Sequence, residues 1–162
     1  MKISALALTI LALVFATTGY AQMGSSGHSA HPGKDVYQKA NCIGCHKWHG
    51  GGGGGYGGAA LSLRETMLDA AGLKLTVRCG RPATGMPYHD RSAYQGDDTS
   101  CYGLTKEDLG EDLPPRARSF LREPQIDEVV DYVLTHLKGK GAPTKEECVE
   151  FWGEGSKECQ SM

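Results

Sequence analysis

The clearest pattern of hydrophobic and polar positions lies in the last third of the chain, after Pro124. Apolar side chains recur there at intervals of three and four residues, which places them on one face of an α-helix. This stripe comprises Ile126, Val129, Val130, Val133, Leu134 and Leu137. Gly139 and Gly141 follow it, and glycine is common just after a helix. We therefore predict an amphipathic helix over residues 124–137 that buries the stripe against another helix.

Shorter helical patterns precede this one. Residues 35–41 and 69–78 show similar apolar spacing over fewer turns, and the second pattern stops before Gly80. Residues 105–109 begin with a threonine suited to cap a single helical turn. Residues 88–101 are rich in aspartate, glycine and serine and are expected to form a loop.

The start of the chain has a different character. Lys2 precedes an apolar run over residues 3–16, and small residues lead to a plausible cleavage point before Gln22. No later stretch reaches the ~18 apolar residues that a membrane-spanning helix needs, so we expect no membrane span. We expect four segments: a signal peptide at 1–21, a flexible arm at 22–32, a main domain at 33–141 and an acidic C-terminal extension at 142–162. The signal predicts export to the periplasm.

Cys42, Cys45 and His46 form a Cys-x-x-Cys-His motif, the attachment signature of a c-type haem. The two thiols can form thioether bonds to one porphyrin, and the adjacent imidazole can ligate its iron. A zinc site would need a second cysteine pair at similar spacing, which the other four cysteines do not form. A redox-active dithiol would be expected in a βαβ setting, whereas a short helix and a glycine run flank this motif. We therefore interpret it as a haem attachment site.

A candidate for the opposite face of the iron is Met86, in the sequence Gly85-Met86-Pro87. An isolated methionine is more often a core residue. Here, however, glycine and proline hold it in a loop after a predicted helix. Methionine opposite histidine raises the reduction potential and is an electron-transfer pairing. We expect His46 and Met86 to be the axial ligands of one haem.

With these motifs the chain resembles the class I (monohaem) cytochrome c family. The resemblance rests on the helix that leads into the Cys42-to-His46 motif, the Met86 loop and the closing amphipathic helix, and it spans residues 33–137. It implies an all-α fold of three to five helices around one haem c, a cytochrome c domain at 33–141, and His46 and Met86 as axial ligands. It also implies a periplasmic bacterial electron carrier.

A glycine-rich loop follows the haem motif, from Gly50 to Gly58 with Tyr56 inside it. Ordering such a loop is entropically costly and buries no side chains, so it is either a mobile flap or backbone lying close to the haem. In many members of the family a Gly-Pro carbonyl near this point accepts the second ring proton of the proximal histidine. The comparable stretch here is Gly57-Gly58-Ala59-Ala60-Leu61, and the acceptor for His46 is left open.

The remaining cysteines suit disulfides in an oxidising compartment. A bond between Cys79 and Cys101 would fix both ends of the segment that carries Met86, and a bond between Cys148 and Cys159 would tie down the extension. Four cysteines allow three pairings, and the sequence does not choose among them. The extension either packs on the body as a stapled turn or docks a partner.

Composition narrows the function further. The chain has 17 Lys and Arg against 19 Asp and Glu, a formal net charge of −2. This mild acidity, with no basic stripe, argues against nucleic-acid binding. We expect a monomeric electron carrier and no enzyme, because outer-sphere electron transfer needs no acid, base or nucleophile from the protein. The resemblance suggests a periplasmic alcohol, methanol or aldehyde dehydrogenase as donor and another cytochrome or a terminal oxidase as acceptor.

Two alternative functions stay open. One is a haem peroxidase or gas-binding protein with an open sixth coordination position, in which Tyr88 or His89 would be a distal group. The other is a fixed electron-transfer subunit of a larger redox complex, docked by its C-terminal extension.

Overall fold

The computed structural model describes residues 31–55 and 59–162. Within these ranges the fold is helical and has no β-sheet, only an isolated bridge between Tyr88 and Arg116. The α-helices are α1 (Pro32–Lys39), α2 (Cys42–His46), α3 (Ala70–Cys79), α4 (Lys106–Leu109), α5 (Glu123–Tyr132) and α6 (Lys145–Trp152). The all-α prediction is confirmed, with one helix more than the expected three to five. The predicted signal peptide and most of the predicted arm lie outside the described residues.

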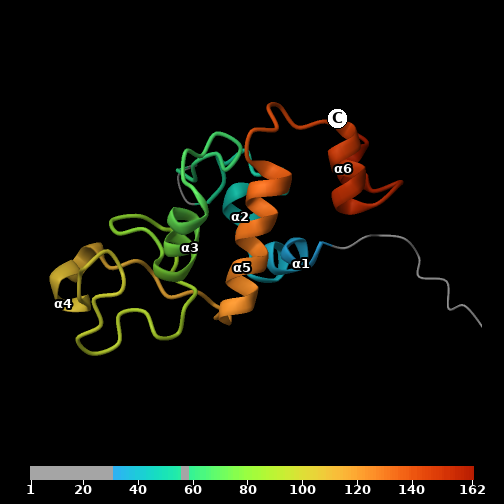
Figure 1. The fold of residues 1–162 in the computed structure, drawn as a ribbon. Helices are drawn as coiled ribbons and strands as arrows, with labels where there is room; N and C mark the ends of the chain where they lie inside the picture. The colour runs from blue at the N-terminus through green and yellow to red at the C-terminus, as the bar shows by residue number, and fades with distance from the viewer. Residues whose placement is uncertain (1–30, 56–58) are drawn as a thin grey trace, which may run out of the picture.

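Helices α1 and α5 cross near the middle of the molecule (Figure 1). Gly33 makes the crossing close, because a Cβ atom at this position would lie 1.9 Å from the carbonyl oxygen of Glu128 and 2.7 Å from the Cβ of Tyr132. Helix α1 begins at Pro32, earlier than the expected residue 35. Proline suits a first helical position, and the His31 ring caps the helix by accepting a hydrogen bond from the Gly33 N–H at 3.2 Å.

The predicted apolar stripe forms the main core. Its buried members join residues of α1, α3 and α6 in one cluster: Val36, Tyr37, Leu73, Ile126, Val129, Val130, Tyr132, Val133, Leu137 and Phe151. The closing helix crosses the helix that leads into the haem motif, as we expected. Phe151 belongs to the C-terminal extension, so the extension packs on the body of the protein.

The closing helix is not α-helical to its end. Helix α5 is followed by a wider π-helical turn at Val133–Leu137, in which the Lys138 N–H donates to the Val133 carbonyl at 2.8 Å. The next N–H, that of Gly139, donates to the Arg64 carbonyl at 2.9 Å. The wide turn is therefore followed directly by a contact with Arg64, which lies beyond the glycine-rich loop in the sequence.

A second cluster lies around α3 and α4 and comprises Cys79, Ala93, Tyr94, Cys101 and Leu109. Helix α3 matches its predicted range closely, with Asp69 accepting from the Gly72 N–H at 2.8 Å as the N-cap and Gly80 following its last residue. Helix α4 begins with the expected threonine cap. Residues 88–101 form a loop with isolated turns, also as predicted.

No helix in the described part of the chain combines the length and the apolar character that crossing a membrane would require.

Candidate functional site

Helix α2 presents the Cys-x-x-Cys-His motif. Cys42 and Cys45 are three residues apart in this helix, so they lie on one face. They are also the two cysteines without a disulfide partner in the described part of the chain. The remaining four are paired as Cys79 with Cys101 and Cys148 with Cys159, which selects one of the three possible pairings.

The environment of these thiols disfavours the other chemistries that a Cys-x-x-Cys pair can perform. Burial raises the pKa of the Cys42 thiol to about 12, whereas a redox-active cysteine needs a lowered pKa. Among the described residues, no cluster of three or more His, Cys, Asp or Glu side chains is placed to hold a metal ion. The raised pKa of Cys42 therefore disfavours the redox-dithiol interpretation.

His46 ends α2, and its ring is oriented by the backbone. Its Nδ1 lies 2.9 Å from the carbonyl oxygen of Leu61, and because a carbonyl only accepts, Nδ1 carries the proton. Burial lowers the pKa of His46, which favours the neutral ring. The Nε2 lone pair is then available for a metal, the arrangement seen when a second hydrogen bond orients a ligating histidine. The Leu61 carbonyl is the acceptor that the sequence left open.

The described part of the glycine-rich loop folds back onto the end of α2. The N–H groups of Gly52 and Gly54 donate to the carbonyls of His46 and Cys45 at 3.2 and 2.9 Å. A Cβ atom at Gly54 would lie 2.4 Å from the Cys45 carbonyl oxygen, so only glycine allows this approach. Gly53 donates to the Ala60 carbonyl at 2.8 Å. The loop thus lies close to the haem motif. It also holds the segment 60–64, which carries Leu61.

Met86 lies in a compact loop after α3. The Arg81 N–H donates to the Met86 carbonyl at 3.2 Å, and the Met86 N–H donates to the Thr84 hydroxyl at the same distance. Gly80 allows the loop to close, since it has a φ of +66° and a Cβ there would lie 2.6 Å from the Met86 carbonyl oxygen. The side chain of Met86 is half-buried.

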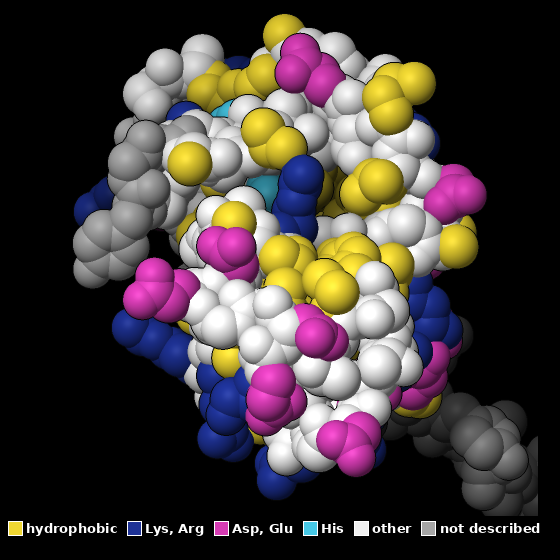
Figure 2. All heavy atoms as spheres, turned by 90° about the vertical axis from the view of Figure 1, so that its left-hand side faces the viewer, with side chains coloured by type: hydrophobic (Ala, Val, Ile, Leu, Met, Phe, Trp, Pro, Cys, Tyr) yellow, Lys and Arg dark blue, Asp and Glu magenta, His cyan; other side chains and the backbone are white. Residues whose placement is uncertain are grey.

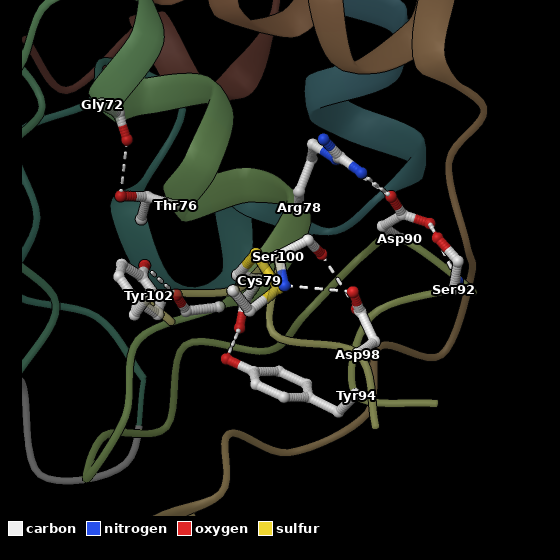
Figure 3. Close-up of a disulfide and its surroundings, with 12 residues drawn as sticks. Gly72, Thr76, Arg78, Cys79, Asp90, Ser92, Tyr94, Asp98, Ser100 and Tyr102 are labelled. Atoms are coloured by element: carbon white, nitrogen blue, oxygen red, sulfur yellow. Dashed lines mark hydrogen bonds and ion pairs between the residues drawn. A yellow bond between two sulfur atoms is a disulfide. The ribbon is translucent and has the colours of Figure 1, made fainter. Parts of the chain in front are cut away.

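The base of this loop is fixed by a disulfide and two tyrosines (Figure 3). Cys79 is bonded to Cys101, with their Cα atoms 5.5 Å apart. The Tyr94 hydroxyl donates to the Cys79 carbonyl at 2.9 Å, and the Tyr102 hydroxyl donates to the Gly80 carbonyl at 2.6 Å. These contacts hold the start of the Met86 loop from the side of residues 94–102.

Tyr88 and His89 follow the Met86 loop and have partners of their own. The Tyr88 ring packs edge-on against Tyr94, with centroids 5.5 Å apart. His89 is 3% exposed, and its Nδ1 donates to the Ser119 carbonyl at 3.3 Å. Both rings are thus packed against other parts of the chain, and the His89 ring is oriented by the Ser119 carbonyl.

His89 leads to a pH-dependent prediction. Burial lowers its pKa, so the folded protein keeps the ring neutral while the unfolded chain protonates it below about pH 6.5. The stability contributed by the neutral ring is complete above that pH and is lost as the pH falls through the lowered pKa. Between about pH 7 and about pH 5, the free energy of unfolding should therefore fall less in His89→Gln than in the unmodified protein. Urea unfolding at both pH values measures this difference, and equal falls would contradict it.

One face of the molecule has the apolar character that a large cofactor would need. Hydrophobic side chains gather around a recess on one face, with histidine and a basic side chain in it (Figure 2). Leu61, whose carbonyl accepts from the His46 ring, has an exposed side chain (61%), and Met67 is 92% exposed. Together with two free thiols on one helix face and a neutral, oriented imidazole, these features fit a covalently bound haem.

The sequence did not identify two residues that support His46. Leu61 acts through its backbone carbonyl, which has no side-chain signature. Arg64 is 6% exposed and binds the carbonyl of His49 at 3.0 Å. The only signal for Arg64 was a cationic residue close to the motif, and sequence alone does not show that it is buried.

The family model described as Cytochrome c matches residues 30–137 of the chain. No curated protein and no solved structure matches the chain.

Proposed function

Since the chain belongs to the cytochrome c family, a family of haem-based electron-transfer proteins, we propose that it is a monohaem electron carrier of the periplasm. The observation that carries the proposal is the arrangement on α2. Two free thiols share one face of the helix, and the following His46 donates from Nδ1 to Leu61 while Nε2 stays available.

Each residue of the site has a definite role in this proposal. Cys42 and Cys45 would form the thioether bonds that hold the porphyrin, and His46 would ligate the iron through Nε2. Met86 would supply the second protein ligand from its loop. The bound haem supplies an iron that alternates between the ferrous and ferric states. The hydrogen bonds of the His46 ring and the Met86 loop would keep both side chains in place, so that little reorganisation would accompany electron transfer.

The contacts around Met86 support a carrier over a peroxidase or a gas-binding protein. A loop fixed by the Cys79–Cys101 disulfide and by Tyr94 is suited to keep the sixth position filled. The packing of Phe151 in the main core gives the extension a role within its own chain, which disfavours a permanently docked subunit. Two disulfides favour an oxidising compartment such as the periplasm. We retain a dehydrogenase as donor and a cytochrome or terminal oxidase as acceptor.

The proposal is tested by the visible absorption spectrum of the haem-loaded protein, recorded oxidised, reduced, and reduced under carbon monoxide. We expect a low-spin spectrum that carbon monoxide does not change, and haem that stays with the protein on acid-acetone extraction. Met86→Ala should bind carbon monoxide and have a lower reduction potential, because methionine raises the potential of a haem. Carbon monoxide binding to the unmodified protein would instead indicate an open site and overturn the proposed carrier function.

A further inference from the structure

Arg64 is a buried cation that connects three segments of the chain. Its side chain is 4% exposed. Nη1 donates to the His49 carbonyl at 3.0 Å, Nη2 donates to both carboxylate oxygens of Glu147 at 3.0 Å, and Nε donates to the Gly141 carbonyl. The guanidinium therefore joins the start of the glycine-rich loop to the C-terminal extension. A buried arginine with one partner removed is costly, so these contacts act as a set.

Arg64 is the last residue of the segment 60–64, which orients the proximal histidine through the Leu61 carbonyl. Three residues earlier, the Leu61 carbonyl accepts the Nδ1 proton of His46. Between them, the Leu63 N–H donates to the Gly50 carbonyl at 2.7 Å. The glycine-rich loop thus holds the segment 60–64 along its length, and the extension holds its last residue, Arg64.

The extension is rigid enough to serve as an anchor. Glu147 and Thr144 form the capping box of α6, with hydrogen bonds of 3.1 and 3.2 Å. At the C-terminal end of the helix, Lys34 donates to the carbonyls of Glu150 and Phe151 at 3.3 and 3.1 Å. The Cys148–Cys159 disulfide closes the segment after the helix. Helix α6 lies beyond residues 30–137, the part of the chain that matches the family.

We propose that Arg64 is a positioning residue and that the C-terminal extension, through Glu147, is a clasp that holds the Leu61 carbonyl on His46. The inference rests on the proposed function, in which His46 is the proximal ligand. A hydrogen bond from Nδ1 to a carbonyl raises the basicity of the ligating ring and so favours the ferric state. Loosening the clasp weakens that bond and shifts the reduction potential to a more positive value.

The test compares the haem-loaded Arg64→Lys and Glu147→Gln variants with the unmodified protein. Arg64→Lys keeps the charge but loses the planar fork that contacts several acceptors at once. Both variants should have a more positive potential, and in the ferrous state the His46 ring N–H should exchange with solvent at least about tenfold faster, as measured by NMR. Arg116→Lys is the matched control, because Arg116 is exposed and its guanidinium lies over the Phe120 ring, 4.7 Å from the centroid. It should change neither quantity.

The outcomes separate this inference from the proposed function. An unmodified protein without His46 and Met86 ligation would overturn the proposed function, whatever the variants show. A normal spectrum together with unchanged potential and unchanged exchange in both variants would overturn the clasp alone. If Arg64→Lys fails to fold, the exchange rate in Glu147→Gln decides by itself, since loss of a through-space charge alters the potential but does not expose the ring N–H.

Discussion

Replacing Gly33 with alanine should lower the free energy of unfolding by about 2–3 kcal/mol. The added Cβ would lie 1.9 Å from the Glu128 carbonyl oxygen, which is backbone in the middle of α5 and has no rotamer that relieves the clash. The two helices must move apart, and their shared core loosens with them. Alanine also favours a helix over glycine by about 1 kcal/mol, so the cost of the clash itself is larger than the net effect.

Chemical denaturation of the haem-loaded protein, followed by circular dichroism, measures this loss. Gly85→Ala is the matched control, because no atom lies within 4 Å of a Cβ built there. It should change the stability by no more than about 0.5 kcal/mol. Since α1 leads directly into the haem motif, Gly33→Ala should also reduce the yield of haem-loaded protein. Equal stability of the two variants would mean that α1 and α5 do not cross at Gly33.

Removing the Cys79–Cys101 disulfide should have two separable effects. The Cys79→Ser/Cys101→Ser double variant should lose about 3 kcal/mol of stability, because the disulfide closes a loop of 22 residues. Its second effect should appear at the haem. The base of the Met86 loop loses its covalent link and keeps only the Tyr94 and Tyr102 hydrogen bonds, so carbon monoxide should compete with Met86 for the ferrous iron.

The second disulfide supplies the control. Cys148→Ser/Cys159→Ser opens a loop of 11 residues, and its loss should cost a similar amount, again about 3 kcal/mol. That bond lies in the extension and does not touch the Met86 loop, so this variant should remain closed to carbon monoxide. Carbon monoxide binding by both double variants would show that general loss of stability, and not the clamp at Cys79, opens the sixth position.

The sequence predicted those features that periodic side chains encode. The stripe from Ile126 to Leu137 indicated the closing helix, and the same residues form the core. The stripe also reaches Leu137, where the helical segment ends, but it did not predict the change to a π-helical turn at Val133–Leu137, because no local propensity reports a contact such as that between Gly139 and Arg64. The start of α1 at Pro32 was missed for a related reason, since its cap is the His31 ring.

In the candidate site, too, some features could be predicted from the sequence and others could not. Its side-chain chemistry was legible in the Cys-x-x-Cys-His motif, and the structure sets the two free thiols and an oriented imidazole on one short helix. The residues that hold the imidazole in place could not be predicted from the sequence. Leu61 contributes a carbonyl that every residue has, and Arg64 meets Glu147 across 83 positions of sequence. Only the folded chain shows which carbonyl and which carboxylate are used.

The burial of the cysteines has a consequence for how the protein matures. Thioether formation requires Cys42 and Cys45 as reduced thiols, whereas the folded chain depends on two oxidised pairs. Cys79, Cys101, Cys148 and Cys159 are each at most 3% exposed, while Cys42 and Cys45 are partly exposed. Thiol–disulfide exchange requires direct attack on a sulfur atom. In the folded chain the sulfur atoms of the two disulfides are therefore shielded from a cellular reductant, so conditions that keep Cys42 and Cys45 as thiols need not break the structural bonds.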